Sequence, residues 1–213
     1  SSLVSEEHPG STVVTDSITS NHLTAFLENT LGLNHLRFKR GYKNVINKAI
    51  ELNAAGTDCQ LAIETSGHAA LKENFFLDDG AYLAVKIIVK AAKLAKEGKT
   101  IDGLLADLKD PEEEREVRMN ITCEEFGSYG DSILADLVAW AEQAPGVQVV
   151  APNYEGVRLD FDQAQGWCLL RKSLHDPLMP LNIESDIPGG CKLIAELLRP
   201  FLAQYEFLDI SKL

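Results

Sequence analysis

LAIETSGHAALKENFFLDDG, residues 61–80, joins an apolar run to a group of polar side chains. In an extended segment Glu64, Ser66 and His68 point the same way, and Gly67 lets the backbone turn. A carboxylate, a hydroxyl and an imidazole can bind sugar hydroxyls, and an imidazole can move a proton near neutral pH. An ordinary strand end and turn is the alternative. A nucleophile pair of Ser66 and His68 is disfavoured, because no Gly-x-Ser-x-Gly surrounds the serine.

Hydrophobic periodicity on both sides of this segment predicts an α/β layered domain. Strands are expected at residues 12–16 and 58–64, with helices at 20–31 and 42–56 between them. A long helix follows Asp78 and Asp79, whose carboxylates suit a helix N-terminus, and a shorter one is expected at 100–108. The polar group then leaves the carboxyl end of the second strand, where ligands bind in open α/β sheets.

A boundary is expected at KDPEEER, residues 109–115, where proline and a run of acids interrupt any packed element. We therefore expect domains at residues 1–110 and 111–213. In the second, short strands are expected at 116–122 and between residues 147 and 185, with a helix at 131–144. A closing helix at 189–205 contains Pro200, which should kink or break it. The pattern predicts a smaller α+β domain with a mostly antiparallel sheet and two helices.

Composition limits the class of protein. The 213 residues are 45% hydrophobic, enough for two modest cores, and no run of eighteen apolar residues occurs. The first residues lack the basic and apolar regions of a signal peptide, so we expect a cytoplasmic protein that contacts no membrane. Four cysteines lie far apart without metal-ligand spacing and are expected to be buried free thiols: Cys59, Cys123, Cys168 and Cys191.

The net charge of −12 argues against a nucleic-acid partner, because phosphate backbones need a basic face. Residues 1–110 carry 12 basic against 14 acidic side chains, net −2, and residues 111–213 carry 8 against 18, net −10. Within the first half, LRFKRGYK concentrates four basic residues, Arg37, Lys39, Arg40 and Lys43. A small anion or a solvated basic loop would explain this group equally well.

A second candidate site is LLRKSLHDP, residues 169–177, in which a predicted strand ends in Arg171, Ser173, His175 and Asp176. A guanidinium fork, a hydroxyl and the backbone amides of a turn form a common phosphate cradle. An ordinary surface turn is the alternative.

Six segments, in chain order, resemble the last two domains of an α-D-phosphohexomutase, the phosphoglucomutase and phosphomannomutase family: VVTDSITS, FKRGYK, IETSGH, FFLDDG, YEGVRLDF and GWCLLRKSLHDP. IETSGH is similar to the family's sugar loop Gly-Glu-x-Ser-Gly-His, with Ile63 in place of the first glycine. RKSLHDP keeps the arginine, serine and proline of the family's phosphate loop, whereas Leu174 and His175 depart from it.

This resemblance implies roles for particular residues. Glu64 and Ser66 would bind hydroxyls of a hexose, and His68 would transfer a proton or contact the ligand. Asp78 would support these residues from behind. Lys39 would approach the sugar phosphate or ring. The phosphate that is not reacting would be held by Arg171 and Ser173, with His175 as a further donor.

The resemblance also implies a longer parent enzyme. Family members transfer phosphate from a phosphoserine loop and bind Mg²⁺ in an N-terminal half, and neither loop occurs here; TSNHL (19–23) and LDFDQ (159–163) do not match them. The parent would interconvert hexose 1-phosphate and 6-phosphate, of glucose or mannose, through a 1,6-bisphosphate. This chain would need the missing domains as its partner and be inactive alone. A phosphoglucosamine mutase and a non-catalytic sugar-phosphate-binding module remain alternatives.

Overall fold

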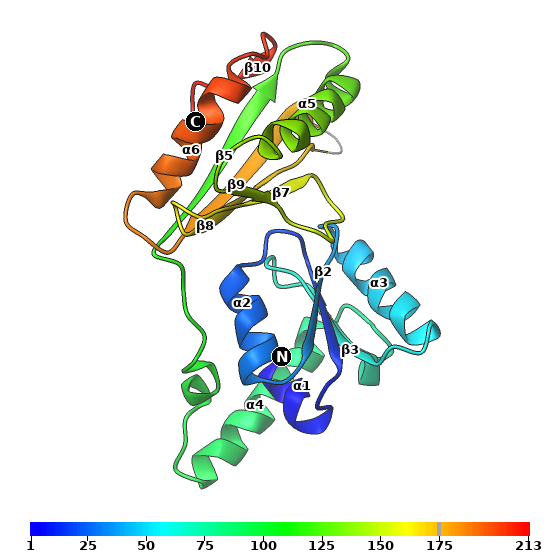
Figure 1. Ribbon diagram of the computed structural model, residues 1–213. Helices are drawn as coiled ribbons and strands as arrows, with labels where there is room; N and C mark the ends of the chain where they lie inside the picture. Colours follow the sequence, from blue (N-terminus) through cyan, green and yellow to red (C-terminus); the bar gives the residue numbers. More distant parts are fainter. Residues whose placement is uncertain (174–175) are drawn as a thin grey trace. The chain divides into compact units, whose positions relative to one another are not determined.

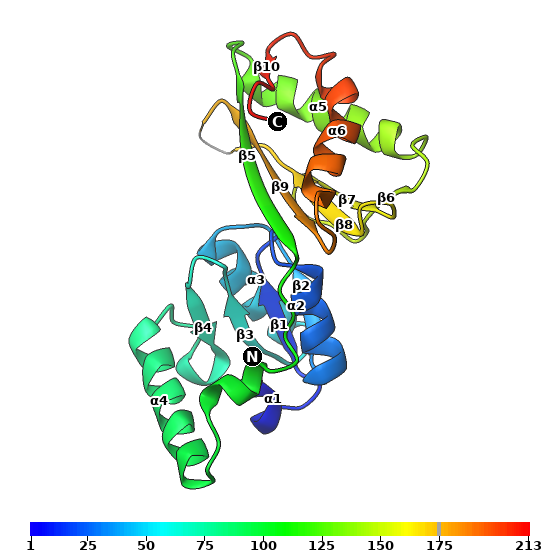
Figure 2. The ribbon, with the colours of Figure 1, turned by 90° about the vertical axis from the view of Figure 1, so that its left-hand side faces the viewer.

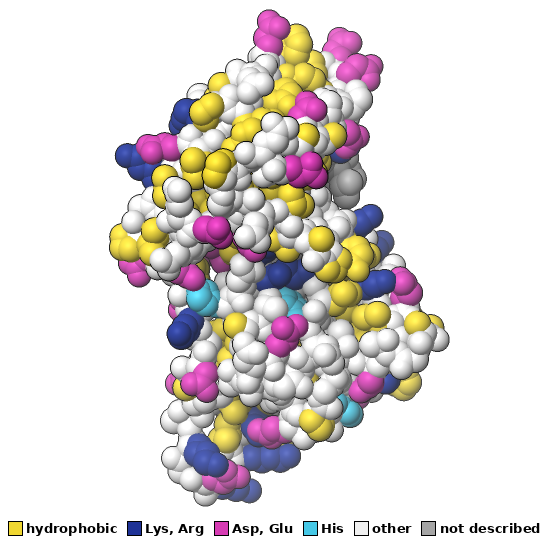
Figure 3. Space-filling model, in the orientation of Figure 1, with side chains coloured by type: hydrophobic (Ala, Val, Ile, Leu, Met, Phe, Trp, Pro, Cys, Tyr) yellow, Lys and Arg dark blue, Asp and Glu magenta, His cyan; other side chains and the backbone are white. Residues whose placement is uncertain are grey.

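The computed structural model describes residues 1–173 and 176–213. The chain divides into two compact units, Ser1–Asp110 and Pro111–Leu213 (Figures 1 and 2). Acidic side chains occur on both units over the face shown in Figure 3. Each unit has its own sheet and its own apolar core, as the composition led us to expect.

The first unit contains a four-stranded sheet in the order β2-β1-β3-β4. Its strands are β1 (Thr12–Thr15), β2 (Asn34–Arg37), β3 (Cys59–Ile63) and β4 (Ala69–Leu71). β1 pairs in parallel with both β2 and β3, whereas β4 is antiparallel to β3. The carboxyl ends of β1, β2 and β3 therefore meet at one edge of the sheet.

Helices cover both faces of this sheet, because neighbouring residues of β1 point to opposite sides. Val14 packs with Val45 and Ala49 of α3 (Tyr42–Ala54). Val13 packs on the other face with Leu27 and with residues of α1 (Ser2–Glu7) and α4 (Gly80–Lys96). α2 (Asn21–Ala25) lies on this second face and continues as the π-helical turn Phe26–Thr30, which contains Leu27.

Several local predictions for this unit were wrong. The sequence did not predict β2, β4 or α1, because each of them is short. β2 is also partly exposed along its length, so its sequence has no apolar pattern. The helix expected at 20–31 is an α-helix that changes to a π turn. The helix expected at 100–108 is only a 3₁₀ turn, Ile101–Leu105, and a second such turn, Lys72–Asn74, precedes α4.

The second unit is a six-stranded antiparallel sheet in the order β10-β5-β9-β8-β7-β6. Its strands are β5 (Glu113–Ile121), β6 (Val147–Val149), β7 (Val157–Phe161), β8 (Gly166–Leu170), β9 (Leu178–Ser185) and β10 (Leu208–Asp209). Two helices, α5 (Phe126–Ala141) and α6 (Gly190–Leu202), pack on one face, where Ile133 and Ile194 share a core with Met119 and Leu181. The predicted fold class is confirmed.

Two details of the second unit differ from expectation. β5 begins at Glu113, inside the segment expected to be an unstructured boundary, because strand pairing with β9 extends to Glu113 opposite Ser185. α6 continues past Pro200 to Leu202. Proline so near the end of a helix removes one hydrogen bond from the last turn only, so the helix is not broken there.

The cysteines are mostly buried free thiols, as expected. All four cysteines are free; three are buried, whereas Cys123 is partly exposed. Burial raises the pKa of the Cys168 thiol to about 12 and that of Cys59 to about 11, so both are protonated at neutral pH. In the described ranges, the helices are too short or too polar to span a membrane.

Candidate functional site

Three loops meet at the carboxyl edge of the first sheet, each following one of the parallel strands. Asp16 follows β1, residues 38–41 follow β2, and residues 64–68 follow β3. In the order β2-β1-β3 the chain leaves β1 toward one side and returns to the other, so a topological switch point lies between β1 and β3. Asp16 and Thr65 join across this point, since Thr65 Oγ1 donates to Asp16 Oδ2 at 2.7 Å.

The polar segment after β3 is a tight turn, which corrects the extended alternation that we expected. Gly67 N donates to Glu64 O at 3.0 Å, and Glu64 N donates to His68 O at 2.9 Å. Gly67 has φ 95°, a backbone conformation that glycine adopts without steric cost. The turn leads into β4, so Glu64 and His68 are paired across a hairpin.

The Glu64 carboxylate is fixed by two donors. It is 8% exposed. Gly41 N, at the start of α3, donates to Oε1 at 2.5 Å, and Ser66 Oγ donates to Oε2 at 3.1 Å. Each carboxylate oxygen can accept a further hydrogen bond. The structure therefore brings two of the predicted sugar-binding residues, Glu64 and Ser66, into direct contact.

His68 is paired with Asp78. Its Nδ1 lies 2.6 Å from Asp78 Oδ2, and Ala69 N donates to the other oxygen at 3.2 Å. A carboxylate can only accept, so Nδ1 carries the proton and Nε2 of the neutral ring is left as an acceptor. The ring is about half exposed. In its neutral form the ring thus presents Nε2 as an acceptor beside the Glu64 turn.

Sequence reasoning missed Tyr42, the first residue of α3. Its ring stacks on that of His68, with centroids 5.0 Å apart and an angle of 26° between the planes. Its neighbour Gly41 holds Glu64, so the start of α3 contacts both polar side chains of the turn. An aromatic residue next to a glycine was the available signal.

Asp16 was also missed. It is fully buried, and burial raises the pKa of its carboxyl while the hydroxyl of Thr65 and the nearby charge of Arg40 oppose that shift. A carboxyl group directly after the buried strand VVT was the signal in the sequence.

The basic group after β2 separates into different roles. Arg37 donates to the carbonyls of Thr19 and Ser20, at 3.0 and 2.9 Å, and so holds the start of α2. Lys39 and Lys43 are exposed. Within this basic group, Lys39 and Lys43 are therefore the side chains most accessible to a ligand.

The predicted phosphate loop joins β8 to β9 in the second unit. Arg171 and Ser173 lie on its first part, with Ser173 N donating to Leu178 O at 3.0 Å and Ser173 Oγ accepting from Asp176 N at 3.2 Å. Lys172 turns to α5, where its Nζ donates to Asp131 Oδ1 at 2.6 Å and to Gly127 O at 3.1 Å. His175 lies outside the described residues.

Gly156 shapes the base of this loop. It has φ 60°, and a Cβ added there would lie 2.2 Å from Leu170 O and 2.8 Å from Arg171 Cα. Only a residue without a side chain lets the backbones of β7 and the loop approach this closely.

In the described part of the chain, no group of three or more histidine, cysteine, aspartate or glutamate side chains is placed to hold a metal ion. A magnesium site is therefore not assigned to any of these residues.

Comparison with known proteins identifies the chain's relatives. The family described as "Phosphoglucomutase/phosphomannomutase, alpha/beta/alpha domain III" matches residues 2–111. A phosphomannomutase/phosphoglucomutase of Pseudomonas putida is 28% identical over 204 residues, covering 95% of this chain and 40% of the relative. The chain thus spans about two fifths of the length of the curated relatives that it matches.

Solved structures share the fold. A phosphoglucomutase/phosphomannomutase family protein from Burkholderia thailandensis superposes with a TM-score of 0.72 at 23% identity, over 96% of this chain and 40% of that one. N-acetylphosphoglucosamine mutase of Aspergillus fumigatus, solved with GlcNAc-6P and magnesium, superposes at 0.56 and 15% identity, over 96% and 40%. The same fungal enzyme, as a variant with glucose 1,6-bisphosphate, superposes at 0.54 and 14% identity, over 95% and 40%. With its domain III match covering half of its length, the chain belongs to the phosphoglucomutase/phosphomannomutase family.

Proposed function

We propose that this chain is the sugar- and phosphate-binding half of a phosphohexomutase that interconverts hexose 1-phosphate and hexose 6-phosphate. One observation carries the proposal: Glu64, Ser66 and the pair of His68 and Asp78 gather at the switch-point edge of the first sheet. Membership of the mutase family supports it.

Each side chain has a definite task in this reaction. Glu64, anchored by Gly41 and Ser66, would accept hydrogen bonds from two adjacent ring hydroxyls. His68 Nε2 would take the proton of the hydroxyl that attacks phosphorus, while Asp78 holds the Nδ1 proton. The phosphoryl donor would be a phosphoserine outside these 213 residues, and the product of the first transfer would be a 1,6-bisphosphate. Arg171 and Ser173 would hold the phosphate that is not reacting, and Lys39 would approach the sugar phosphate.

The relatives support the ligand classes in this proposal. The Aspergillus enzyme was solved with magnesium, with GlcNAc-6P and with glucose 1,6-bisphosphate. Magnesium would neutralise charge on the transferring phosphoryl group when bound. Residues of this chain would bind and orient the sugar and move its proton.

Calorimetric titration of the chain with glucose 1-phosphate, mannose 1-phosphate and free glucose tests the binding function. Both phosphates should bind and glucose should not. Glu64→Gln should weaken binding of both esters. The substitution removes the negative charge that strengthens the hydrogen bonds proposed between Glu64 and the ring hydroxyls. Binding of glucosamine 1-phosphate in preference to both would favour a phosphoglucosamine mutase. Equal binding of glucose and glucose 1-phosphate would contradict the role proposed for Arg171 and Ser173 in holding a phosphate.

A further inference from the structure

Lys172 lies in sequence between the two residues to which we assign the phosphate, yet its side chain points away from theirs. Leu170 belongs to the core that α5 and α6 cover. Because side chains alternate along an extended segment, Lys172 lies on this helix-covered side of the sheet, and Arg171 and Ser173 lie on the other side. A lysine of the predicted phosphate loop is thus directed at a helix, and its contacts there indicate what it does.

α5 holds Lys172 through polar bonds and through packing. Nζ donates to Asp131 Oδ1 at 2.6 Å and to Gly127 O at 3.1 Å. The aliphatic part of the side chain crosses Gly130, which is buried. A Cβ added to Gly130 would lie 3.0 Å from Lys172 Cδ and 3.3 Å from Cγ. The missing side chain at Gly130 therefore makes room for Lys172 against the helix.

The strand ladder holds this part of the loop weakly. Arg171 N donates to Pro180 O at 3.1 Å, but proline has no N–H to donate in return. Ser173 N donates to Leu178 O at 3.0 Å, whereas Leu178 N donates to Asp176 O at 2.7 Å. Each of these two pairs of described residues therefore shares one ladder bond, where a regular pair of this kind shares two. The contact of Lys172 with α5 adds an attachment between them.

We propose that Lys172 is a positioning residue for the phosphate site. By fixing the backbone between Arg171 and Ser173 to α5, it holds both of their side chains in place for a phosphate ester. This inference rests on the phosphate role proposed for those two residues. Ion pairs with an exposed partner contribute little to the free energy of unfolding, and Asp131 is 65% exposed. Loss of the anchor should therefore lower the affinity for phosphate more than it lowers stability.

A purely electrostatic role of Lys172 predicts a different result at Asp131. By charge alone this acid disfavours a nearby anion, so Asp131→Ala would strengthen phosphate binding. The anchor predicts the reverse, because Nζ loses its carboxylate partner and the loop is held less firmly. Glu142→Ala is the control, since it removes an acid at the C-terminal end of the same helix and should leave the affinity unchanged. Tighter binding by Asp131→Ala would overturn the proposal.

A pair of glycines in α5 gives a matched test that leaves every charge in place. Gly130→Ala puts a methyl group against the stem of Lys172, whereas a Cβ at Gly127 would meet nothing within 4 Å. Both substitutions raise the helix propensity of α5, and Gly127→Ala keeps the carbonyl oxygen that Lys172 binds. In calorimetric titrations Gly130→Ala should bind glucose 1-phosphate about tenfold more weakly, the lower end for loss of one hydrogen bond to a charged group. Gly127→Ala should bind it as wild type does.

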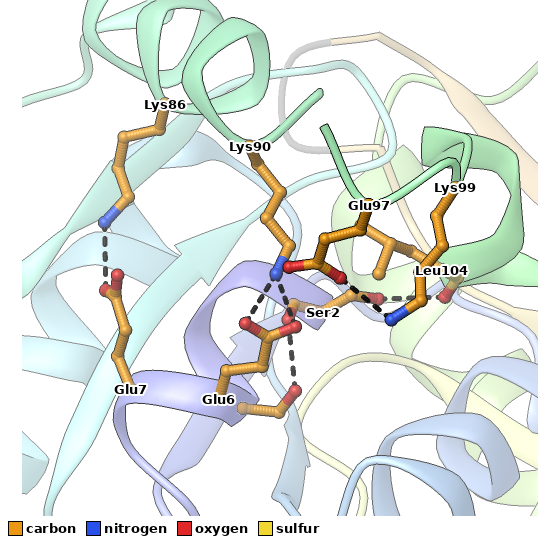
Figure 4. A network of polar contacts seen from close by, with 9 residues as sticks. Ser2, Glu6, Glu7, Lys86, Lys90, Glu97, Lys99 and Leu104 are labelled. Atoms are coloured by element: carbon orange, nitrogen blue, oxygen red, sulfur yellow. Dashed lines mark hydrogen bonds and ion pairs between the residues drawn. The ribbon is translucent and has the colours of Figure 1, made fainter. Parts of the chain in front are cut away.

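Lys172→Met keeps the stem and removes Nζ, so it should weaken ester binding as Gly130→Ala does. Lys90→Met is the control, because it also removes one positive charge and one ion pair, that between Lys90 of α4 and Glu6 of α1 (Figure 4). It should leave the affinity unchanged. Since the anchor is already lost in Lys172→Met, adding Gly130→Ala should cause little further loss. Fully additive losses would overturn the proposal.

Hydrogen exchange of the Ser173 amide tests the anchor without a ligand. This amide donates to Leu178 O, so Gly130→Ala and Lys172→Met should speed its exchange, while amides in the middle of β9 keep their rates. If wild type bound no phosphate ester, the phosphate role of Arg171 and Ser173 would fail, and this positioning role with it. Where wild type binds, equal affinity in wild type and Gly130→Ala overturns the positioning role alone, and so does an unchanged exchange rate at Ser173.

Discussion

His68 and Asp78 face each other across the β4 hairpin, with Nδ1 of the ring 2.6 Å from Oδ2 of the carboxylate. They are ten residues apart in the sequence. An isolated antiparallel β-bridge between Ala70 and Asp78 brings the two segments side by side. The carboxylate also accepts from Ala69 N, so it holds both the ring and the backbone beside it. The orientation of the proposed proton acceptor therefore depends on one aspartate.

Removal of that aspartate should change the tautomer of His68. In Asp78→Ala, Nδ1–H loses its acceptor, so the ring should populate both neutral tautomers, whereas wild type should hold the proton on Nδ1. Nitrogen-15 chemical shifts of the ring measure the two forms. Asp79→Ala is the control, because Asp79 caps α4 and does not contact the ring. Equal tautomer populations in wild type and Asp78→Ala would remove Asp78 from this role.

The buried carboxyl of Asp16 should make stability depend on pH. Burial raises its pKa, so the folded chain keeps this proton to a higher pH than the unfolded chain, whose value is about 3.9. Its contribution to the free energy of unfolding therefore falls as pH rises from about 4 through the raised pKa. Asp16→Asn keeps an acceptor for Thr65 but does not titrate, so wild type should lose stability relative to this variant between pH 4 and 7. Urea denaturation at both pH values measures the difference.

Asp58 provides a control of opposite sign. Its hydrogen bond with Lys72 lowers its pKa, so its contribution is present above about pH 4 and is lost as pH falls through the lowered value. Asp58→Asn should therefore be less stable than wild type at pH 7, with the difference fading toward pH 3. If Asp16→Asn followed the same trend, the assignment of a raised pKa to Asp16 would be wrong.

Sequence patterns predicted the longer elements of the first unit but not all of the residues at its candidate site. β1, β3, α3 and α4 are apolar or amphipathic over several residues, so periodicity predicted each of them. β2 and β4 are visible only through pairing with β1 and β3, because their short sequences carry no period of their own. Glu64, Ser66 and His68 were predicted from residue type. Asp16 and Tyr42 were missed because their importance comes from contacts between loops that are distant in sequence.

Gly156 should be sensitive to even the smallest side chain. In Gly156→Ala the new Cβ would meet the backbone oxygen of Leu170, so the loop that carries Arg171 must move. We expect a loss of about 2–4 kcal/mol in the free energy of unfolding, of the size seen when a packed site is overfilled and strained. Gly146→Ala is the matched control, because Gly146 also has positive φ but its nearest neighbour would be 3.7 Å from the Cβ. It should lose only about 1 kcal/mol, the cost of the left-handed conformation. Equal losses in a urea titration would contradict the close approach.

Arg171 should supply a large part of the affinity for phosphate esters. Its backbone N donates to Pro180 O at 3.1 Å, and this bond survives truncation of the side chain, so the base of the loop should stay in place. Arg171→Ala should weaken binding of glucose 1-phosphate by about 1.5–3 kcal/mol, typical of a hydrogen bond to a charged group. Lys192→Ala is the control, because this substitution also removes one positive charge. Lys192 lies on α6, where it forms an exposed ion pair with Glu196. Calorimetry should show loss of affinity for the first variant alone. Unchanged affinity in Arg171→Ala, with binding intact in wild type, would exclude this arginine from the proposed phosphate site without bearing on the sugar-binding role proposed for the turn at Glu64.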